Sequence, residues 1–170
     1  MLTRNHPKTV IYQITPQHRQ AIRRFLSASW GTYHLYSQER VFDADTFPGY
    51  IAYQKGYIIG LITYMYQDEE QSGEIMTLNV VPQARRLGVA SRLFSHVKTT
   101  LQTKKCQHIL VTTTNENQPA RQFYAKHHFV EKQVHIESIA HARAIGITTP
   151  PMGYNGMPIE TEIEFELSLF

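Results

Sequence analysis

Cysteine, charged residues and long apolar runs are all scarce in this sequence. Its 170 residues include one cysteine, Cys106, which excludes an internal disulfide framework and a cluster of thiolate ligands. Charged residues make up 18% of the chain and the formal net charge is +3, unlike disordered or highly charged chains. No stretch approaches the roughly 18 uninterrupted apolar residues of a membrane-spanning helix. We therefore expect a soluble, cytoplasmic protein without a membrane partner.

Several functional signatures are absent as well. The N-terminal segment MLTRNHPKTV has no apolar run after its basic residues and does not resemble a secretory signal. Neither a Walker loop nor a G-x-G-x-x-G fingerprint occurs. The nine histidines are scattered without the spacing of metal ligands, so we expect no metal. The isoelectric point near 9.0 permits an anionic partner, but the basic residues form no long run and we expect no nucleic-acid partner.

The apolar residues that are present, 42% of the chain, suffice for one substantial core, and we expect a single domain over residues 1–170. Their periodicity predicts alternating strands and helices. The expected strands are 9–15, 50–54, 57–66, 74–81, 108–113, 129–136 and 159–169. The expected helices begin at Thr15–Pro16, near Gly88 and at Asn117, with a helical turn over 137–145. Residues 32–48 are rich in aromatic side chains and are expected to form a short helix with loops.

The segment after Val81 has features of an anion-binding site. The first N–H groups of a helix have no partner within the helix and carry partial positive charge, which favours phosphate. Gly88 permits close approach of a ligand, Ala90 adds only a methyl group, and Arg85 and Arg86 add positive charge. A pyrophosphate fits this pattern, and an ordinary strand-to-helix turn with solvated arginines fits it equally well.

A second group of residues lies in the helix predicted from Asn117. Seven positions separate Asn117 from Tyr124, which is nearly two helical turns, so the two side chains share a face about 10 Å apart along the axis. One polar and one phenolic group then line a single groove. Taken alone, the pair is better explained by a capping asparagine and a half-buried core tyrosine.

Together, in this order, the two segments resemble the GCN5-related N-acetyltransferase (GNAT) family. The family's acetyl-CoA motif, Arg or Gln, x, x, Gly, x, Gly or Ala, appears as Arg85, Arg86, Leu87, Gly88, Val89 and Ala90. Its later N-x-x-A-x-x-x-Y segment appears as Asn117, Ala120 and Tyr124, followed by Phe129. The resemblance covers residues 50–129 well. It implies a mixed α/β fold with six or seven mostly antiparallel strands flanked by helices, opened between the strands that end at Val81 and Thr113.

The resemblance also implies an activity, namely transfer of acetyl from acetyl-CoA to a primary amine by direct attack in a ternary complex. In the family, strand backbone holds the pantetheine, helix-terminal amides hold the pyrophosphate, and the tyrosine is the general acid. A phenol is a plausible proton donor to a thiolate whose conjugate thiol has a pKa near 8.5. The implied acetyl-CoA-binding residues are Leu78, Val80, Arg85, Arg86, Leu87, Gly88, Val89, Ala90, Ser91, Asn117 and Tyr124.

The general base is less well specified than the acid. Glu74 occupies the strand position at which histone-acetyltransferase relatives place a catalytic glutamate, whereas many relatives deprotonate the amine through water chains. Thr112 stands where ribosomal-protein N-terminal acetylases carry a glutamate, which disfavours that subgroup. His128 replaces the glycine that usually precedes the phenylalanine, and this departure leaves the geometry of that turn open.

The resemblance implies that the acceptor is a small-molecule or peptide amine. The acidic stripe from Glu160 to Glu166 would attract a cationic amine, although a solvated sheet face explains it better. Dimers are common among relatives, so a homodimer is compatible with the resemblance. The alternative function is a non-catalytic acyl-CoA-binding sensor or partner module.

Overall fold

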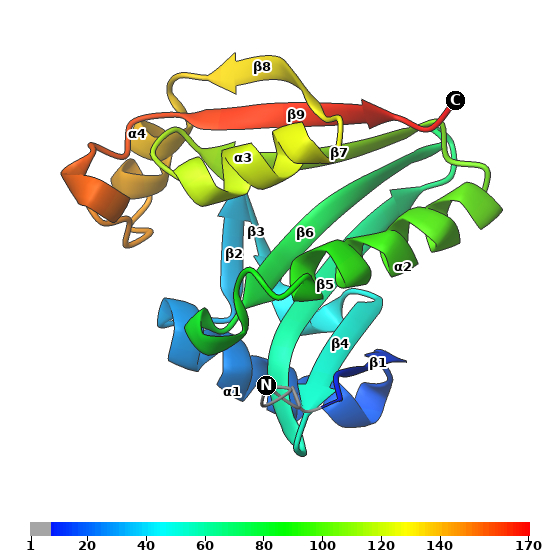
Figure 1. Ribbon diagram of the computed structural model, residues 1–170. Helices are drawn as coiled ribbons and strands as arrows, with labels where there is room; N and C mark the ends of the chain where they lie inside the picture. Colours follow the sequence, from blue (N-terminus) through cyan, green and yellow to red (C-terminus); the bar gives the residue numbers. More distant parts are fainter. Residues whose placement is uncertain (1–7) are drawn as a thin grey trace, which may run out of the picture. The chain divides into compact units, whose positions relative to one another are not determined.

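A computed structural model describes residues 8–170 (Figure 1). The strands in this part of the chain are β1 (Val10–Gln13), β2 (His34–Ser37), β3 (Arg40–Asp43), β4 (Gly49–Gln54), β5 (Tyr57–Gln67), β6 (Ser72–Val80), β7 (His108–Thr114), β8 (Val130–His135) and β9 (Glu162–Ser168). The α-helices are α1 (Arg19–Trp30), α2 (Val89–Thr103), α3 (Gln118–Lys126) and α4 (Ser138–Ala144). Short 3-10 turns lie at Pro16–His18, Ala44–Thr46, Pro82–Ala84 and Tyr154–Gly156.

Seven of these strands form a mixed sheet in the order β1-β4-β5-β6-β7-β9-β8, and β2 pairs with β3. The pairs β1–β4, β4–β5, β7–β9 and β8–β9 are antiparallel. The pair β6–β7 is parallel over Ser72–Ile75 and His108–Val111, because the crossover helix α2 returns the chain in the same direction. The predicted mixed, mostly antiparallel sheet is therefore confirmed.

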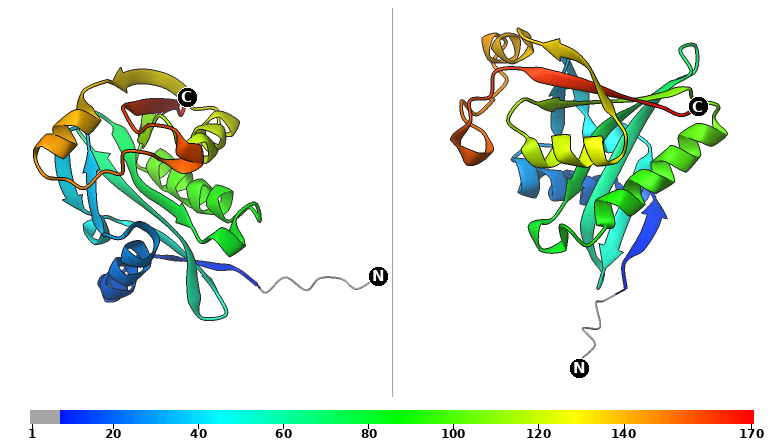
Figure 2. Two further views of the ribbon diagram at one scale, coloured as in Figure 1. Left: turned by 90° about the vertical axis from the view of Figure 1, so that its left-hand side faces the viewer. Right: turned by 45° about the horizontal axis from the view of Figure 1, so that its top comes forward.

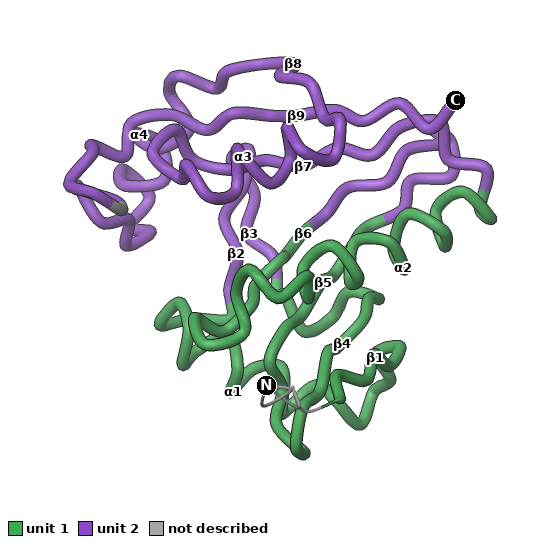
Figure 3. The backbone as a smooth tube through the Cα atoms, viewed as in Figure 1, with its two compact units in different colours: residues 1–33, 43–65, 76–104 green, residues 34–42, 66–75, 105–170 purple. Residues whose placement is uncertain are grey.

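The chain divides into two compact units (Figure 3). Unit 1 comprises residues 1–33, 43–65 and 76–104, and unit 2 comprises residues 34–42, 66–75 and 105–170. The single domain expected over residues 1–170 stays a prediction, and its residues 1–7 lie outside the described part of the chain.

Unit 1 is built on β4 and β5 with α2 packed against them. Leu61 and Ile62 of β5 are fully buried. A Cβ atom at Gly60 would lie 3.0 Å from side-chain atoms of both Val89 and Leu93, so the missing side chain lets the first turns of α2 approach the strand closely. The expected hairpin between β4 and β5 is present. Its turn residues Lys55 and Gly56 have φ values of 51° and 80°, as a tight hairpin turn requires.

In unit 2, strands β7, β9 and β8 run side by side (Figures 1 and 2). Val111 lies opposite Phe165, and Ile109 lies opposite Leu167; all four side chains are buried. Since side chains alternate along a strand, these residues share one face of the sheet. The ring of Tyr124 on α3 packs against Phe165 with 5.8 Å between ring centroids, which places α3 on that face.

Residues 32–48 were expected to form a short helix with loops, and this expectation is wrong. Strands β2 and β3 form a hairpin there, and the helical part is the 3-10 turn Ala44–Thr46. The turn residues Gln38 and Glu39 have φ values of 46° and 65°. Such turns usually carry Asn, Asp or Gly. Since Gln and Glu stand here instead, the sequence pattern did not indicate a turn at this position.

The solvated acidic face expected on the last strand is also wrong. Glu162 and Glu164 of β9 are only 5% and 7% exposed, whereas Glu160 precedes the strand and is exposed. The backbone amide of Gln38 donates to Glu162 at 3.1 Å, and the Ser138 hydroxyl donates to the same carboxylate. Residues far away in sequence therefore cover this face.

Candidate active site

The predicted anion-binding loop belongs to unit 1 and connects β6 to α2. Arg86 and Gly88 have φ values of 61° and 78°, a left-handed conformation that turns the chain sharply before the helix. All residues from 85 to 88 are exposed. A Cβ atom at Gly88 would have no heavy atom within 4 Å. The backbone of this loop is thus open to an external ligand.

The two arginines of this loop have different roles in the structure. The Arg85 side chain donates from Nε to the carbonyl oxygen of Val80 at 3.0 Å, which holds the loop against the end of β6. Arg86 is exposed. The first hydrogen bond of α2 runs from the amide of Arg92 to the carbonyl of Gly88 at 3.0 Å. The amide of Ala90 lies before this bond, among the first amides that a helix leaves without a partner of its own.

The other predicted acetyl-CoA-binding residues of unit 1 flank this loop. Leu78 is partly exposed and Val80 is buried near the end of β6. In α2, Val89 is buried, while Ala90 and Ser91 are partly exposed. Leu87 in the loop has a 53% exposed side chain. Unit 1 therefore brings these together: Leu78, Val80, Arg85, Arg86, Leu87, Gly88, Val89, Ala90 and Ser91.

Asn117 in unit 2 is the N-cap of α3, as its sequence position suggests. Its Oδ1 atom accepts from the amide of Ala120 at 3.3 Å, which satisfies one of the unpaired amides of the first turn. Its Nδ2 atom donates to the hydroxyl of Thr113 at 3.1 Å. The side chain thereby ties the end of β7 to the start of α3.

Tyr124 lies two turns later and is 6% exposed. Its ring packs against Phe129 and Phe165 with centroid distances of 5.5 Å and 5.8 Å. Burial raises the pKa of the phenol above its ordinary value of 10.0, because an apolar environment disfavours the phenolate. Among the described residues, none hydrogen-bonds its hydroxyl. The phenol is thus protonated at neutral pH.

The turn at His128 resolves the departure from the family pattern. His128 has a φ of 66°, the conformation that a glycine would adopt at little cost. The following amide, from Phe129, donates to the carbonyl of Tyr124 at 3.0 Å, and the Phe129 side chain is buried. The turn after α3 therefore keeps a glycine-like backbone despite the histidine.

Glu74 lies on β6 within unit 2 and is half-buried. The pKa of its carboxyl is raised above 4.5, first by burial and then by the charges of Glu164 and Glu162, while Arg40 lowers it. A carboxylate with a raised pKa is a stronger base than an ordinary glutamate. This environment differs from that of an exposed carboxylate at a strand end.

Sequence reasoning missed Gln38. Its Nε2 atom donates to Glu164 at 2.6 Å and to the Thr112 hydroxyl at 3.0 Å, and its backbone amide reaches Glu162. No signal in the sequence indicated this residue, because the contacts join a hairpin tip to strands more than 70 positions away in the chain.

Two further findings concern the whole described chain. Among residues 8–170, no group of three or more His, Cys, Asp or Glu side chains is arranged to hold a metal ion. Within the same residues, none of the helices combines the length and apolar character needed to span a membrane.

The fold is that of acetyltransferases of known structure. An IAA acetyltransferase from Bacillus cereus ATCC 14579 superposes with a TM-score of 0.69 at 18% identity, covering 95% of this chain and 100% of that one. A GNAT family acetyltransferase from Elizabethkingia anophelis, solved with acetyl-CoA bound, superposes with a TM-score of 0.68 at 16% identity, covering 95% and 98%.

Sequence comparison identifies the family. Residues 15–129 match the family model described as Acetyltransferase (GNAT) family. The chain is also 30% identical over 142 residues to the protein YdhI of Bacillus subtilis (strain 168), covering 83% of this chain and 86% of YdhI. The protein therefore belongs to the GNAT acetyltransferase family, and the resemblance read from its motifs is confirmed.

Proposed function

We propose that the protein is an acetyl-CoA-dependent N-acetyltransferase, in which residues 1–170 act as one functional domain. The acetyl group passes directly to a primary amine of a small molecule or peptide in a ternary complex. The observation that carries this proposal is the exposed loop before α2, whose Arg86 and Gly88 adopt left-handed conformations and whose backbone faces open space. Family membership supports the same activity.

The loop suits the diphosphate of acetyl-CoA. Amides of the first turn of α2, from Val89 to Ser91, supply donors and the positive end of the helix dipole. Arg86 adds a solvent-facing guanidinium, while Arg85 fixes the loop through the Val80 carbonyl. The backbone of Leu78 and Val80 would hold the pantetheine arm.

The transfer step needs one proton donor and one proton acceptor. The amine nitrogen attacks the thioester carbonyl carbon, a C–N bond forms, and the C–S bond breaks. The sulfur leaves as a thiolate and takes the proton of the Tyr124 hydroxyl. Burial raises the pKa of the phenol, so the Tyr124 hydroxyl keeps its proton until the thiolate forms. The proton released by the amine goes to Glu74 or to a water chain. A fixed strand amide near Val80 would stabilise charge on the carbonyl oxygen.

A thiol-release assay tests the activity. Purified protein is incubated with acetyl-CoA and a panel of primary amines, peptides and amino acids, and free CoA is detected. Release that depends on an amine supports the proposal. Binding of acetyl-CoA by calorimetry without release for any amine would overturn it and would favour the non-catalytic acyl-CoA-binding module.

The diphosphate assignment has its own test. Reversing both charges in Arg85→Glu/Arg86→Glu should weaken acetyl-CoA binding about tenfold or more, because two favourable charges become unfavourable and the Val80 contact is lost. The matched control is Arg19→Glu/Arg24→Glu on α1, which makes the same charge change at exposed positions. Equal affinities for the two double variants in a calorimetric titration would remove the arginines from the site.

A further inference from the structure

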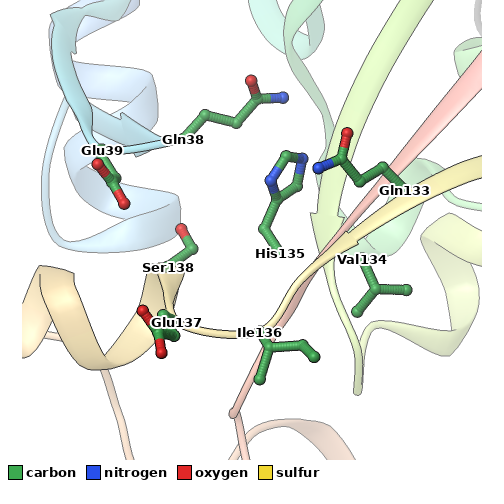
Figure 4. A pocket seen from close by; sticks show the side chains of 8 residues that line it. All are labelled: Gln38, Glu39, Gln133, Val134, His135, Ile136, Glu137 and Ser138. Carbon is green, nitrogen blue, oxygen red and sulfur yellow. The ribbon is translucent and has the colours of Figure 1, made fainter.

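Only a few buried side-chain polar atoms lack a hydrogen-bond partner within the described part of the chain, and one of them is Nδ2 of Asn79 on β6. Two of the others belong to side chains beside a charged group. His135, in the pocket of Figure 4, lies 4.0 Å from Glu164, and Asp45 is bound by Arg23 through its other carboxylate oxygen. Asn79 carries no charge, so an ion pair cannot replace its missing hydrogen bond.

A buried amide without a partner lowers the stability of a protein. Asn79 is 7% exposed, so its Nδ2 group has given up hydrogen bonds to water without replacing them within the described chain. Transfer of an unpaired amide from water to a protein interior is unfavourable. Such groups are rare in native proteins, and a catalytic role is one reason for keeping one. The unpaired donor therefore points to an acceptor outside the chain.

The neighbours of Asn79 show on which face of the sheet it lies. A Cβ atom at Gly60 would lie 3.0 Å from side chains of α2 and 3.4 Å from the side chain of Val80, so Val80 faces α2. Side chains alternate along a strand. Asn79, which precedes Val80, therefore points to the opposite face.

Two buried threonines on the same face have the partners that Asn79 lacks. The hydroxyls of Thr63 and Thr77 lie 2.8 Å apart, and the amide of Thr63 donates to the Thr77 hydroxyl at 3.1 Å. Thr77 lies two positions before Asn79 and shares its face. Thr63 lies three positions after Gly60 and thus also points away from α2, so the two placements agree. Polar pairing on this face ends at Asn79.

Asn79 also lies where the proposed function puts the thioester. It is between Leu78 and Val80, the two residues whose backbone is assigned to the pantetheine arm, and one strand residue spans only about 3.3 Å. No hydrogen bond with a described residue holds its Nδ2 atom. Because rotation about the terminal bond of an asparagine has a broad energy profile, the carboxamide is able to turn Nδ2 towards a ligand.

We propose that Asn79 is a catalytic residue that donates a hydrogen bond from Nδ2 to the carbonyl oxygen of the acetyl thioester. The inference rests on the proposed acetyltransferase activity and adds a side-chain donor to the strand amide near Val80. As the amine nitrogen attacks the carbonyl carbon, negative charge develops on this oxygen, and the electron pair re-forms the C=O bond when the C–S bond breaks. The Asn79 proton stays on its nitrogen. This hydrogen bond is stronger in the transition state than in the ground state.

Two CoA derivatives of similar size test the hydrogen bond, namely acetyl-CoA and S-ethyl-CoA, which lacks the carbonyl oxygen. In calorimetric titrations the wild-type protein should bind acetyl-CoA more tightly. Asn79→Leu, which keeps the branching of the side chain, should lower this preference about two- to tenfold, the effect of one hydrogen bond between neutral groups. Its kcat should fall further, by about 10²-fold or more, as for loss of an oxyanion donor. The infrared stretching frequency of the isotope-labelled thioester carbonyl should rise in the complex with the variant.

Stability separates this role from a structural one. Without acetyl-CoA, the thermal midpoint of Asn79→Leu should be unchanged or higher, because the substitution removes an unpaired buried amide. Asn79→Ala cannot overfill the site and gives the same binding test if leucine does not fit. The matched control is Thr63→Val, which deletes a buried and paired hydroxyl on the same face. Its thermal midpoint should fall, while its preference for acetyl-CoA should stay.

An unchanged carbonyl preference and an unchanged carbonyl frequency in both Asn79 variants would overturn the inference and would leave a buried water as the partner of Nδ2. An equal loss of affinity for both CoA derivatives, together with a lower thermal midpoint, would also overturn it, because this is the behaviour of a structural residue. If the carbonyl preference depends on Asn79 but no amine releases CoA, the hydrogen bond is supported and the enzymatic proposal alone fails.

Discussion

Replacing Tyr124 by phenylalanine removes one hydroxyl group and keeps the aromatic ring. The ring contacts with Phe129 and Phe165, at 5.5 Å and 5.8 Å between centroids, do not involve the hydroxyl. Since no described residue hydrogen-bonds that hydroxyl, its loss leaves no buried partner unsatisfied. The free energy of unfolding should therefore change by less than about 1 kcal/mol at neutral pH.

Turnover should respond much more strongly than stability. A positioned general acid contributes about 10²- to 10⁴-fold to a rate, equivalent to about 2.7 to 5.5 kcal/mol of activation free energy. For Tyr124→Phe we expect kcat to fall by at least about 10²-fold, with acetyl-CoA affinity nearly unchanged. The matched control is Tyr66→Phe, which deletes a hydroxyl bonded to Asp68 at 2.6 Å in the same unit and should leave kcat unchanged.

The raised pKa of Tyr124 also predicts a pH effect on stability. In the unfolded chain the phenol ionises near pH 10, whereas in the folded protein burial keeps it protonated to higher pH. Its contribution is thus fully present below about pH 10 and is lost as the pH rises through the folded pKa. Tyr124→Phe lacks this ionisable group, so its unfolding free energy should fall less steeply than that of the wild type above about pH 10.

Steady-state thiol release gives kcat, calorimetry gives the acetyl-CoA affinity, and urea unfolding at about pH 8 and about pH 11 gives the two stabilities. A kcat for Tyr124→Phe within about twofold of the wild-type value would refute the general-acid role, because the smallest expected loss is far larger. Parallel pH profiles of stability for the two proteins would refute the assignment of a raised pKa to burial.

The remaining predictions concern the general base and the packing of unit 1. Glu74→Gln should lower kcat and remove the acidic limb of the kcat/KM profile; an unchanged profile would favour a water chain. Arg40→Gln should move that limb to higher pH, since Arg40 lowers the pKa of Glu74, and a shift to lower pH would contradict this assignment. Gly49→Ala should destabilise the protein by about 3 kcal/mol in urea unfolding, because a Cβ there would overlap the carbonyl of Ile62 and lie 2.8 Å from the Cα of Thr63; near-native stability would show that β4 can shift.

The elements predicted correctly from the sequence are those whose cause lies within a short segment. Lys55 and Gly56 both have positive φ values and form a tight turn. The residues on either side of the turn form the two strands of the hairpin. Asn117 caps α3 through an amide three residues later. The parallel pair β6–β7 follows from the crossover helix between them. The motif that begins at Arg85 was likewise readable because its residues are contiguous.

The β2–β3 hairpin could not be predicted in the same way. Its turn places Gln38 and Glu39 in the left-handed region without the Asn or Gly that signals such a turn. Tertiary contacts stabilise the hairpin, since the Gln38 side chain donates hydrogen bonds to Glu164 and Thr112. A strained backbone conformation such as that of Gln38 and Glu39 persists where surrounding contacts determine it.

The environment of the candidate base depends on the same contacts. Strand periodicity places Glu74 on β6 and puts Glu162 and Glu164 on one face of β9, but it does not say whether that face meets water or protein. In the folded chain, burial raises the pKa of Glu74, as do the charges of Glu164 and Glu162, whereas Arg40 of β3 lowers it. The basicity of Glu74 is therefore a property of residues that lie up to 90 positions away, so a glutamate at this strand position without a covered acidic β9 would be a weaker base. The position of Glu74 on its strand therefore does not by itself identify it as the general base. Arg40→Gln tests that role more directly, because it changes the electrostatic environment of the Glu74 carboxyl.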